Sequence, residues 1–213
     1  MKKYLAECLG TFALVFCGTG AIIVNEYTNG SLGLLGIALT FGIIISAMIY
    51  VFSNSSGAHI NPSVTIALVI GKVTSIKEAS FYILAQVFGA VLASGLLKLI
   101  FPQSVTLGIT TPSGTLLQSF ILECVLTFFL MLTILGVTFK KDFSNISGLI
   151  IGLLVTGIIL FAGPISGGSF NPARSIAPAI MSENFKALWI YILAPTIGTI
   201  TAMLTWTLIK AKK

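Results

Sequence analysis

The stretch SGAHINPSVT, residues 56–65, interrupts an apolar chain, and a close copy, SGGSFNPARS, follows at residues 166–175. Both copies carry an Asn-Pro pair, which begins at Asn61 in the first and at Asn171 in the second. Asparagine caps helix starts well, and proline suits the first helical position because no amide donor is needed there. The apolar run after each pair is about half of the roughly 20 residues that cross a bilayer. We therefore expect a short helix at each copy that enters the membrane without crossing it.

The rest of the chain has the composition of an integral membrane protein. Of its 213 residues, 56% are hydrophobic and 8% are charged, against roughly 25% charged in soluble domains. Six apolar segments are long enough to cross about 30 Å of hydrocarbon, and two more are half that length. The six lie at 4–24, 33–53, 80–101, 116–138, 146–163 and 187–209, and the two short ones at 61–70 and 171–181. We predict an all-α membrane protein with six transmembrane helices and two re-entrant half-helices.

The net charge of +6 is a topology signal and does not indicate a nucleic-acid partner, because the lysines gather at the ends of spans. The loops at 25–32 and 102–115 carry no Lys or Arg, so the positive-inside rule predicts that both termini are cytoplasmic. Lys98 is expected to snorkel to the outer interface, and Lys186 to lie in an outer loop. The lysines predicted for the cytoplasmic side are Lys2, Lys3, Lys72, Lys77, Lys140, Lys141, Lys210, Lys212 and Lys213.

A second repeat accompanies the first. The segment YLAECLGTFALVF, residues 4–16, is echoed by FILECVLTFFLML, residues 120–132, which pairs Glu7 with Glu123. Each half holds three spans, an odd number, so the second half must enter the membrane from the opposite side. The positive N-termini of the half-helices then face each other at mid-membrane, where non-helical backbone is tolerated if it lines a water-filled cavity. We predict one channel domain over 1–213, built from inverted repeats at about 1–105 and 112–213.

These motifs resemble the aquaporin, or major intrinsic protein, family over essentially the whole chain. The shared features are the paired Asn-Pro boxes, the six spans, the AE-x-x-GT start and the arginine after the second box. SGAH before the first box, AGPISG before the second and PSGT-x-LQSF are most similar to the nodulin-26-like branch and its bacterial relatives. The resemblance implies a passive channel for water and small uncharged solutes that excludes protons and ions. It also implies a homotetramer with one pore in each subunit, and no cofactor or metal.

The boxes are the first site that the resemblance assigns. In the family, the asparagine amides donate hydrogen bonds to the passing molecule and interrupt a continuous proton wire. Most members have alanine third in the first box, where this chain has Ser63, whose hydroxyl either lines the junction or bonds back to nearby groups. The box residues are Asn61, Pro62, Ser63, Asn171, Pro172 and Ala173.

The outer constriction of the family falls on Phe41, Ile159, Gly168 and Arg174 by spacing from the boxes. Arg174 is expected to supply fixed donors and a charge that repels cations. Water-selective members place histidine where this chain has Ile159, and glycerol-selective members usually place an aromatic residue where it has Gly168. The resemblance therefore implies a wider and more apolar opening than a strict water filter, one that is similar to channels for boric or arsenous acid.

Three ionisable residues lie in the predicted membrane region. A carboxylate at that depth is by default a functional hypothesis, and Glu7 and Glu123 match between the halves. In the family, such glutamates accept hydrogen bonds from the backbone of the re-entrant loops, so we assign them structural support. His59 is open between two interpretations, a pore-lining group at the inner mouth and a loop histidine with a local partner.

Three alternatives to a general neutral-solute channel remain. One is a strictly water-selective aquaporin, and another is a proton-coupled transporter in which Glu7 or Glu123 titrates. The third is an adhesive membrane protein with little conductance. We do not expect an enzyme, since the sequence contains no metal-ligand cluster, phosphate-binding glycine loop or nucleophile with a suitable base. We expect the protein in the plasma membrane of a cell, with the lipid bilayer and small neutral solutes as its partners.

Overall fold

The computed structural model describes residues 1–138 and 145–209, and this part of the chain contains eight helices and no strand. Five of the lysines predicted for the cytoplasmic side, Lys140, Lys141, Lys210, Lys212 and Lys213, lie outside the described residues. The helices are α1 (Lys2–Tyr27), α2 (Gly33–Ser56), α3 (Pro62–Ile70), α4 (Ile76–Ile100), α5 (Leu116–Thr138), α6 (Ser147–Ser166), α7 (Pro172–Met181) and α8 (Leu188–Ile209).

Six of these helices are long and apolar enough to cross a membrane, which confirms the predicted all-α architecture. Four spans, α1, α2, α4 and α6, extend beyond their predicted ends by two to four residues, and two of these extensions have a clear local cause. Helix α4 starts four residues early, because the Ser75 hydroxyl accepts a hydrogen bond from the Glu78 amide at 3.2 Å and caps the helix. Helix α6 continues through Pro164 and ends where Gly167 adopts a left-handed φ of 84°.

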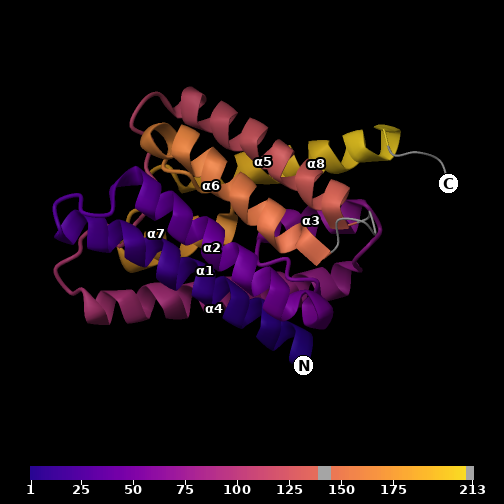
Figure 1. Cartoon of the computed structure of the whole chain (residues 1–213), viewed down its shortest axis with the longest axis horizontal. Helices are drawn as coiled ribbons and strands as arrows, with labels where there is room; N and C mark the ends of the chain where they lie inside the picture. The colour runs from indigo at the N-terminus through magenta and orange to yellow at the C-terminus, as the bar shows by residue number, and fades with distance from the viewer. Residues whose placement is uncertain (139–144, 210–213) are drawn as a thin grey trace.

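The half-helices α3 and α7 begin at their Asn-Pro pairs. Asn61 accepts a hydrogen bond from Ser63 N through its side chain, and Asn171 accepts one from Ala173 N, each at 3.0 Å. Figure 1 shows α3 and α7 toward opposite ends of the long helices. Each is held by the spans, α3 mainly against α8 and α7 mainly against α4. The two short helices therefore approach the middle of the molecule from its two ends.

Small residues set the closest approaches between spans. A Cβ at Gly89 would lie 2.1 Å from the carbonyl oxygen of Cys8, so α4 packs directly on the backbone of α1. A Cβ at Gly198 would lie 2.2 Å from the carbonyl oxygen of Cys124, which gives the same contact between α8 and α5. The two halves thus use equivalent glycine contacts to pair their first and third spans.

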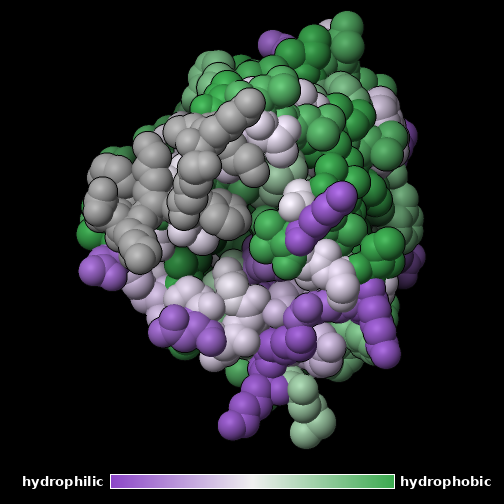
Figure 2. Space-filling model, turned by 90° about the vertical axis from the view of Figure 1, so that its right-hand side faces the viewer, coloured by the Kyte–Doolittle hydropathy of each residue, from purple (hydrophilic) through white to green (hydrophobic). Residues whose placement is uncertain are grey.

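Polar and apolar side chains are segregated on the surface. Figure 2 shows one end of the molecule, where hydrophilic side chains gather beside extensive hydrophobic surface. Lys3 on α1 pairs with Glu78 at the start of α4, so these two helix starts lie at one end. Exposed leucine, isoleucine and phenylalanine side chains cover the flanks of the spans. This distribution fits a bundle whose sides face lipid and whose ends face water.

Candidate functional site

The two asparagines meet at the N-termini of α3 and α7 and bind each other's loops. The Asn61 Nδ2 donates to the carbonyl oxygen of Phe170, and the Asn171 Nδ2 donates to the carbonyl oxygen of Ile60, both at 2.8 Å. Each side-chain oxygen is used to cap its own helix. No acceptor among the described residues takes the second hydrogen of either amide. Each asparagine, 6% exposed, therefore keeps one N–H free beside an internal cavity.

The loops before the half-helices adopt a backbone conformation that is rare for residues other than glycine. Ile60 has a φ of 51° and Phe170 a φ of 54°, in the left-handed region that normally favours glycine. Such residues persist where their surroundings hold them, at a cost of about 1–3 kcal/mol each. The conformation turns the carbonyl oxygens of both residues toward the asparagine of the opposite half.

Two fully buried carboxylates hold these loops. Glu7 accepts hydrogen bonds from His59 N at 2.9 Å and Ile60 N at 2.7 Å. Glu123 accepts equivalent bonds from Ser169 N at 2.9 Å and Phe170 N at 2.7 Å. Charge-assisted bonds of this kind are about twice as strong as neutral ones. The carboxylates therefore stabilise the strained turns.

A serine and a tyrosine extend each carboxylate cluster, and the tyrosines were not among the predicted site residues. Ser56 donates to Glu7 at 2.6 Å, and Tyr82 OH donates to the Ser56 carbonyl oxygen at 2.9 Å. In the second half, Ser166 donates to Glu123 at 2.8 Å, and Tyr191 OH donates to the Ser166 carbonyl oxygen at 2.6 Å. The tyrosines occupy matching places in the repeats, and an alignment of the third spans of the two halves would have revealed them.

The four predicted constriction residues come from four elements and meet as two pairs. The guanidinium carbon of Arg174 on α7 lies 5.3 Å from the ring centroid of Phe41 on α2, a cation–π contact. A Cβ at Gly168, in the loop before α7, would lie 3.6 Å from Cγ1 of Ile159 on α6. Arg174 is 1% exposed and donates from Nη1 to the carbonyl oxygen of Gly108 at 2.7 Å. Its position is thus fixed from two sides.

Two glycines that the sequence analysis did not single out position this constriction. A Cβ at Gly18 on α1 would lie 2.2 Å from Cε1 of Phe41, so only glycine leaves room for the ring as it stands. Gly108 has a φ of 67°, and a Cβ there would lie 2.8 Å from the Cβ of Thr19. Gly108 belongs to a loop without periodicity or a repeat partner, and no pattern in the sequence indicates that it reaches Arg174.

A cavity of about 290 Å³ lies on the side of the junction where α2 ends and α6 begins, which is called the inner cavity below. It is bordered by Asn61, Asn171 and His59 and otherwise mostly by apolar side chains such as Leu14 and Val64. The His59 ring lines the cavity and also has a local partner, since its Nδ1 lies 3.1 Å from the Thr65 hydroxyl. Both interpretations of His59 therefore describe part of its environment.

Ser63 is fully buried and does not line this cavity. Its hydroxyl donates to the side-chain oxygen of Asn61 at 2.8 Å, the same oxygen that caps the helix. The structure thus places Ser63 as a second donor to the cap.

Across residues 1–138 and 145–209, no group of three His, Cys, Asp or Glu side chains could hold a metal ion.

Comparisons with known proteins give one consistent result. The model of the major intrinsic protein family matches residues 1–206. Aquaporin NIP2-1 of Arabidopsis thaliana is 42% identical over 214 residues, which cover 96% of this chain and 74% of that protein. Nodulin-26 of Glycine max is 35% identical over 212 residues, covering 99% and 78%. The X-ray structure of the aquaglyceroporin from Plasmodium falciparum is 26% identical, covers 98% of this chain and 96% of that one, and superimposes with a TM-score of 0.88.

Proposed function

Since the chain belongs to the major intrinsic protein family, we propose that it forms a passive pore for water and small uncharged solutes, including glycerol and metalloid acids such as boric and arsenous acid. The observation that carries this proposal is the crossed pair of asparagines. Asn61 and Asn171 each keep one amide hydrogen for a molecule at the junction while the rest of the amide is fixed by the protein. The pore is proposed as one domain of two inverted repeats, 1–105 and 112–213.

The junction favours neutral molecules that accept hydrogen bonds. A water or hydroxyl oxygen that accepts from both amides is held with its hydrogens pointing away from them. It then cannot pass a proton along a continuous file. The N-termini of α3 and α7 add positive potential at the same place, which opposes cations. The boxes, Asn61-Pro62-Ser63 and Asn171-Pro172-Ala173, are therefore assigned to conduction and ion exclusion.

The constriction decides which solutes pass. Arg174 presents guanidinium donors and a positive charge, while Phe41 and Ile159 present apolar surface. Gly168 adds no side chain at the place where one would approach Ile159. An opening with donors on one wall and space on another suits a compact solute with several hydroxyl groups, such as glycerol or boric acid. This geometry favours the neutral-solute channel over a strictly water-selective one.

The two buried glutamates are assigned to structure and not to transport of protons. Every oxygen of Glu7 and Glu123 accepts from a loop amide, and a serine hydroxyl bonds to each side chain. A carboxylate that changed its protonation during each cycle would lose these bonds and release the strained loops. The protein is accordingly proposed as a channel without enzymatic activity or coupling to a proton gradient.

The assembly and location follow from the family and from the charges. We propose a homotetramer with one pore in each subunit, set in a plasma membrane with both termini in the cytoplasm. The even number of spans and the pairing of Lys3 with Glu78 at one end support this orientation. Native mass spectrometry from lipid nanodiscs and protease protection of a terminal tag would test the two parts separately.

The decisive experiment compares permeabilities of purified protein in proteoliposomes. Stopped-flow light scattering would record water, glycerol, urea, boric acid and arsenous acid, each with and without a pH gradient. We expect rates above those of empty vesicles for water, glycerol and at least one metalloid acid, independent of the gradient. Conduction of water alone would identify a strictly water-selective channel. Solute flux that depends on the pH gradient would support the proton-coupled transporter. Rates equal to empty vesicles for all five would favour the adhesive protein.

A further inference from the structure

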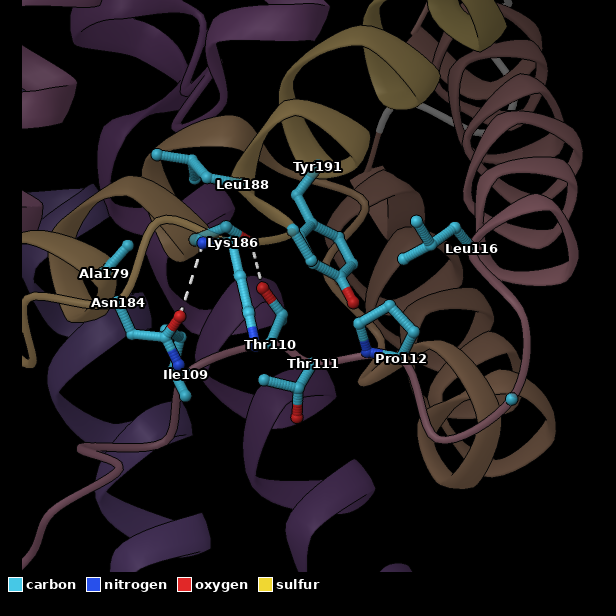
Figure 3. Close-up of a pocket in the computed structure, with 13 residues that line it drawn as sticks. Ile109, Thr110, Thr111, Pro112, Leu116, Ala179, Asn184, Lys186, Leu188 and Tyr191 are labelled. Carbon is cyan, nitrogen blue, oxygen red and sulfur yellow. Dashed lines mark hydrogen bonds between the residues drawn. The ribbon is translucent and has the colours of Figure 1, made fainter.

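A second cavity lies beside α7, at the end of the molecule opposite the Lys3–Glu78 pair, which is the outer end in the proposed orientation. It has a volume of about 390 Å³, larger than the inner cavity, and its wall contains none of the residues assigned to the boxes or the constriction. Three segments build it: the loop between α4 and α5 with the first residue of α5, one stretch of α7 at Ser175 and Ala179, and the start of α8 with the loop before it. Figure 3 shows how the labelled side chains from these segments converge. We refer to this cavity as the outer cleft.

The polar side of the outer cleft carries one cation. Figure 3 shows the Lys186 side chain extending across the cleft toward the loop that carries Thr110 and Thr111. Within the described part of the chain, no carboxylate lies within ion-pair distance of the Lys186 ammonium. The backbone of Lys186 is fixed, since its amide donates to Asn184 Oδ1 at 3.3 Å. The cleft thus presents an unpaired ammonium beside threonine hydroxyls.

Much of the remaining wall is apolar. Ile109, Pro112, Leu116, Ala179 and Leu188 contribute to the wall, and Tyr191 adds its ring. The Tyr191 hydroxyl is already used, because it donates to the Ser166 carbonyl oxygen at 2.6 Å. Volumes of about 300–1,000 Å³ with an apolar lining and a few polar groups are typical of small-molecule sites. A cation set among apolar side chains matches a small carboxylate with an apolar body.

The floor of the outer cleft is connected to the pore. The Thr110 hydroxyl donates to Ser175 Oγ at 2.8 Å, and Ser175 Oγ lies 2.6 Å from Ser169 Oγ. Ser169 in turn donates to the Asn171 carbonyl oxygen at 3.0 Å. The same loop acts on the constriction two residues earlier, where the carbonyl oxygen of Gly108 accepts from Arg174. Movement of this loop therefore reaches both the second box and the constriction.

We propose that the outer cleft binds a small carboxylate with an apolar body, held by Lys186, and that its occupancy changes solute flux by displacing the loop at Gly108–Thr111. The assignment goes beyond conduction, because the site lies apart from the boxes and the constriction and takes a charged ligand, whereas the pore is proposed for uncharged solutes. The loop is the element that both the cleft and Arg174 share, so the bound anion and the permeating solute are coupled through it.

Binding is tested with 4-fluorobenzoate by ¹⁹F NMR on the full-length protein in nanodiscs of neutral lipid. We expect Lys186→Gln to weaken binding by about fivefold, as for one partly exposed ion pair. Thr111→Phe should abolish binding by filling the cleft, and Lys77→Gln, an exposed lysine at the other end, should leave it unchanged. Neutral 4-fluorobenzyl alcohol should bind more weakly than 4-fluorobenzoate. Equal binding by the wild type and both cleft variants would overturn the site.

Coupling is tested by glycerol flux into proteoliposomes with and without saturating 4-fluorobenzoate. We expect a change of at least about twofold in the wild type that is absent in Lys186→Gln, while both proteins conduct equally without the anion. A wild-type flux that is unchanged at saturation would overturn the coupling. Loss of basal flux in every protein, wild type included, would instead reject the channel function proposed above, so the two failures are distinguishable.

Discussion

The two Asn-Pro turns have the same framework and differ in the side chains placed on it. Both use a left-handed residue, a buried glutamate, a serine and a tyrosine, and both asparagines reach across to the other loop. Three residues after the asparagine, however, the first half has Val64, which lines the inner cavity, and the second has Arg174, which meets Phe41. The repeated residues build the junction, and the unrepeated ones give the two mouths different chemistry.

In the proposed channel, this difference would concentrate solute selection on the side of Arg174. The inner cavity is bordered mostly by apolar side chains, with His59 as its ionisable member in the described part of the chain. The outer constriction combines Arg174 with Phe41, Ile159 and Gly168. Under the proposed function, a permeating solute would be selected by charge and size at the end that holds Arg174, and would meet mostly apolar surface at the other. Two kinds of substitution test this difference between the halves. One kind makes the halves more alike, and the other removes the framework that they share.

The largest effect is expected from removing the shared framework. Replacing Glu123 or Glu7 by leucine leaves the two loop amides that the carboxylate binds without an acceptor, at a cost of about 1–3 kcal/mol for each one that is buried, and also removes a bond from a serine hydroxyl. We expect both variants to lose most of the monodisperse protein recovered by size-exclusion chromatography in detergent. Glu183→Gln, on the surface, is the control and should behave as the wild type. If Glu7→Leu were well folded and Glu123→Leu were not, the two frameworks would not be equivalent.

The second largest effect is expected from giving the outer mouth the residue of the inner one. Arg174→Val removes a charge that at about 8 Å contributes roughly 2 kcal/mol to cation exclusion at an effective dielectric constant of about 20. We expect proton leakage to rise by about 30-fold, measured with a pH-sensitive dye inside proteoliposomes. Lys77→Val removes a charge far from the pore and should not change the leak. An unchanged leak in Arg174→Val would assign exclusion to the half-helix termini alone.

A smaller effect is expected at the second constriction position. Ile159→His adds a donor and narrows the space next to Gly168, so glycerol flux should fall by about tenfold while water flux changes little. Stopped-flow measurement of both solutes gives the ratio directly. Ile159→Val, which only removes one methyl group, should keep or increase glycerol flux. A glycerol-to-water ratio that is the same in all three proteins would mean that Ile159 does not line the constriction.

The smallest effect is expected from making the two boxes identical. Ser63→Ala removes one hydrogen bond to the Asn61 cap, worth about 1 kcal/mol, and should lower Tm by about 2–4 °C. Water and glycerol flux should be unchanged, because Ser63 is fully buried. Differential scanning fluorimetry and stopped flow check the two parts, with exposed Ser55→Ala as the reference. A change in flux without a change in Tm would place the Ser63 hydroxyl in the pore.

The features that could be predicted from the sequence are those that appear in its repeats or in its composition. The six spans, the half-helices starting at the Asn-Pro pairs and the matched glutamates all have such a signal. The ends of α4 and α6 were placed less well, since a serine cap and a proline inside a helix depend on local geometry. Gly18 and Gly108 were missed because their roles depend on contacts with Phe41, Thr19 and Arg174 from distant segments. Contacts between segments that are distant in the chain produce no repeated or periodic pattern in the sequence.

The crossed asparagine bonds also have a consequence for biogenesis. Asn61 binds the carbonyl oxygen of Phe170, which is synthesised 109 residues later, so this bond cannot form when the first half leaves the ribosome. Asn171 likewise closes on the loop of the first half and completes the pair only after its own turn has entered the membrane. The Asn61 amide therefore lacks this acceptor until the second half-helix is inserted. A chain truncated before Phe170 cannot complete these bonds, and we expect membrane quality control to recognise and degrade it.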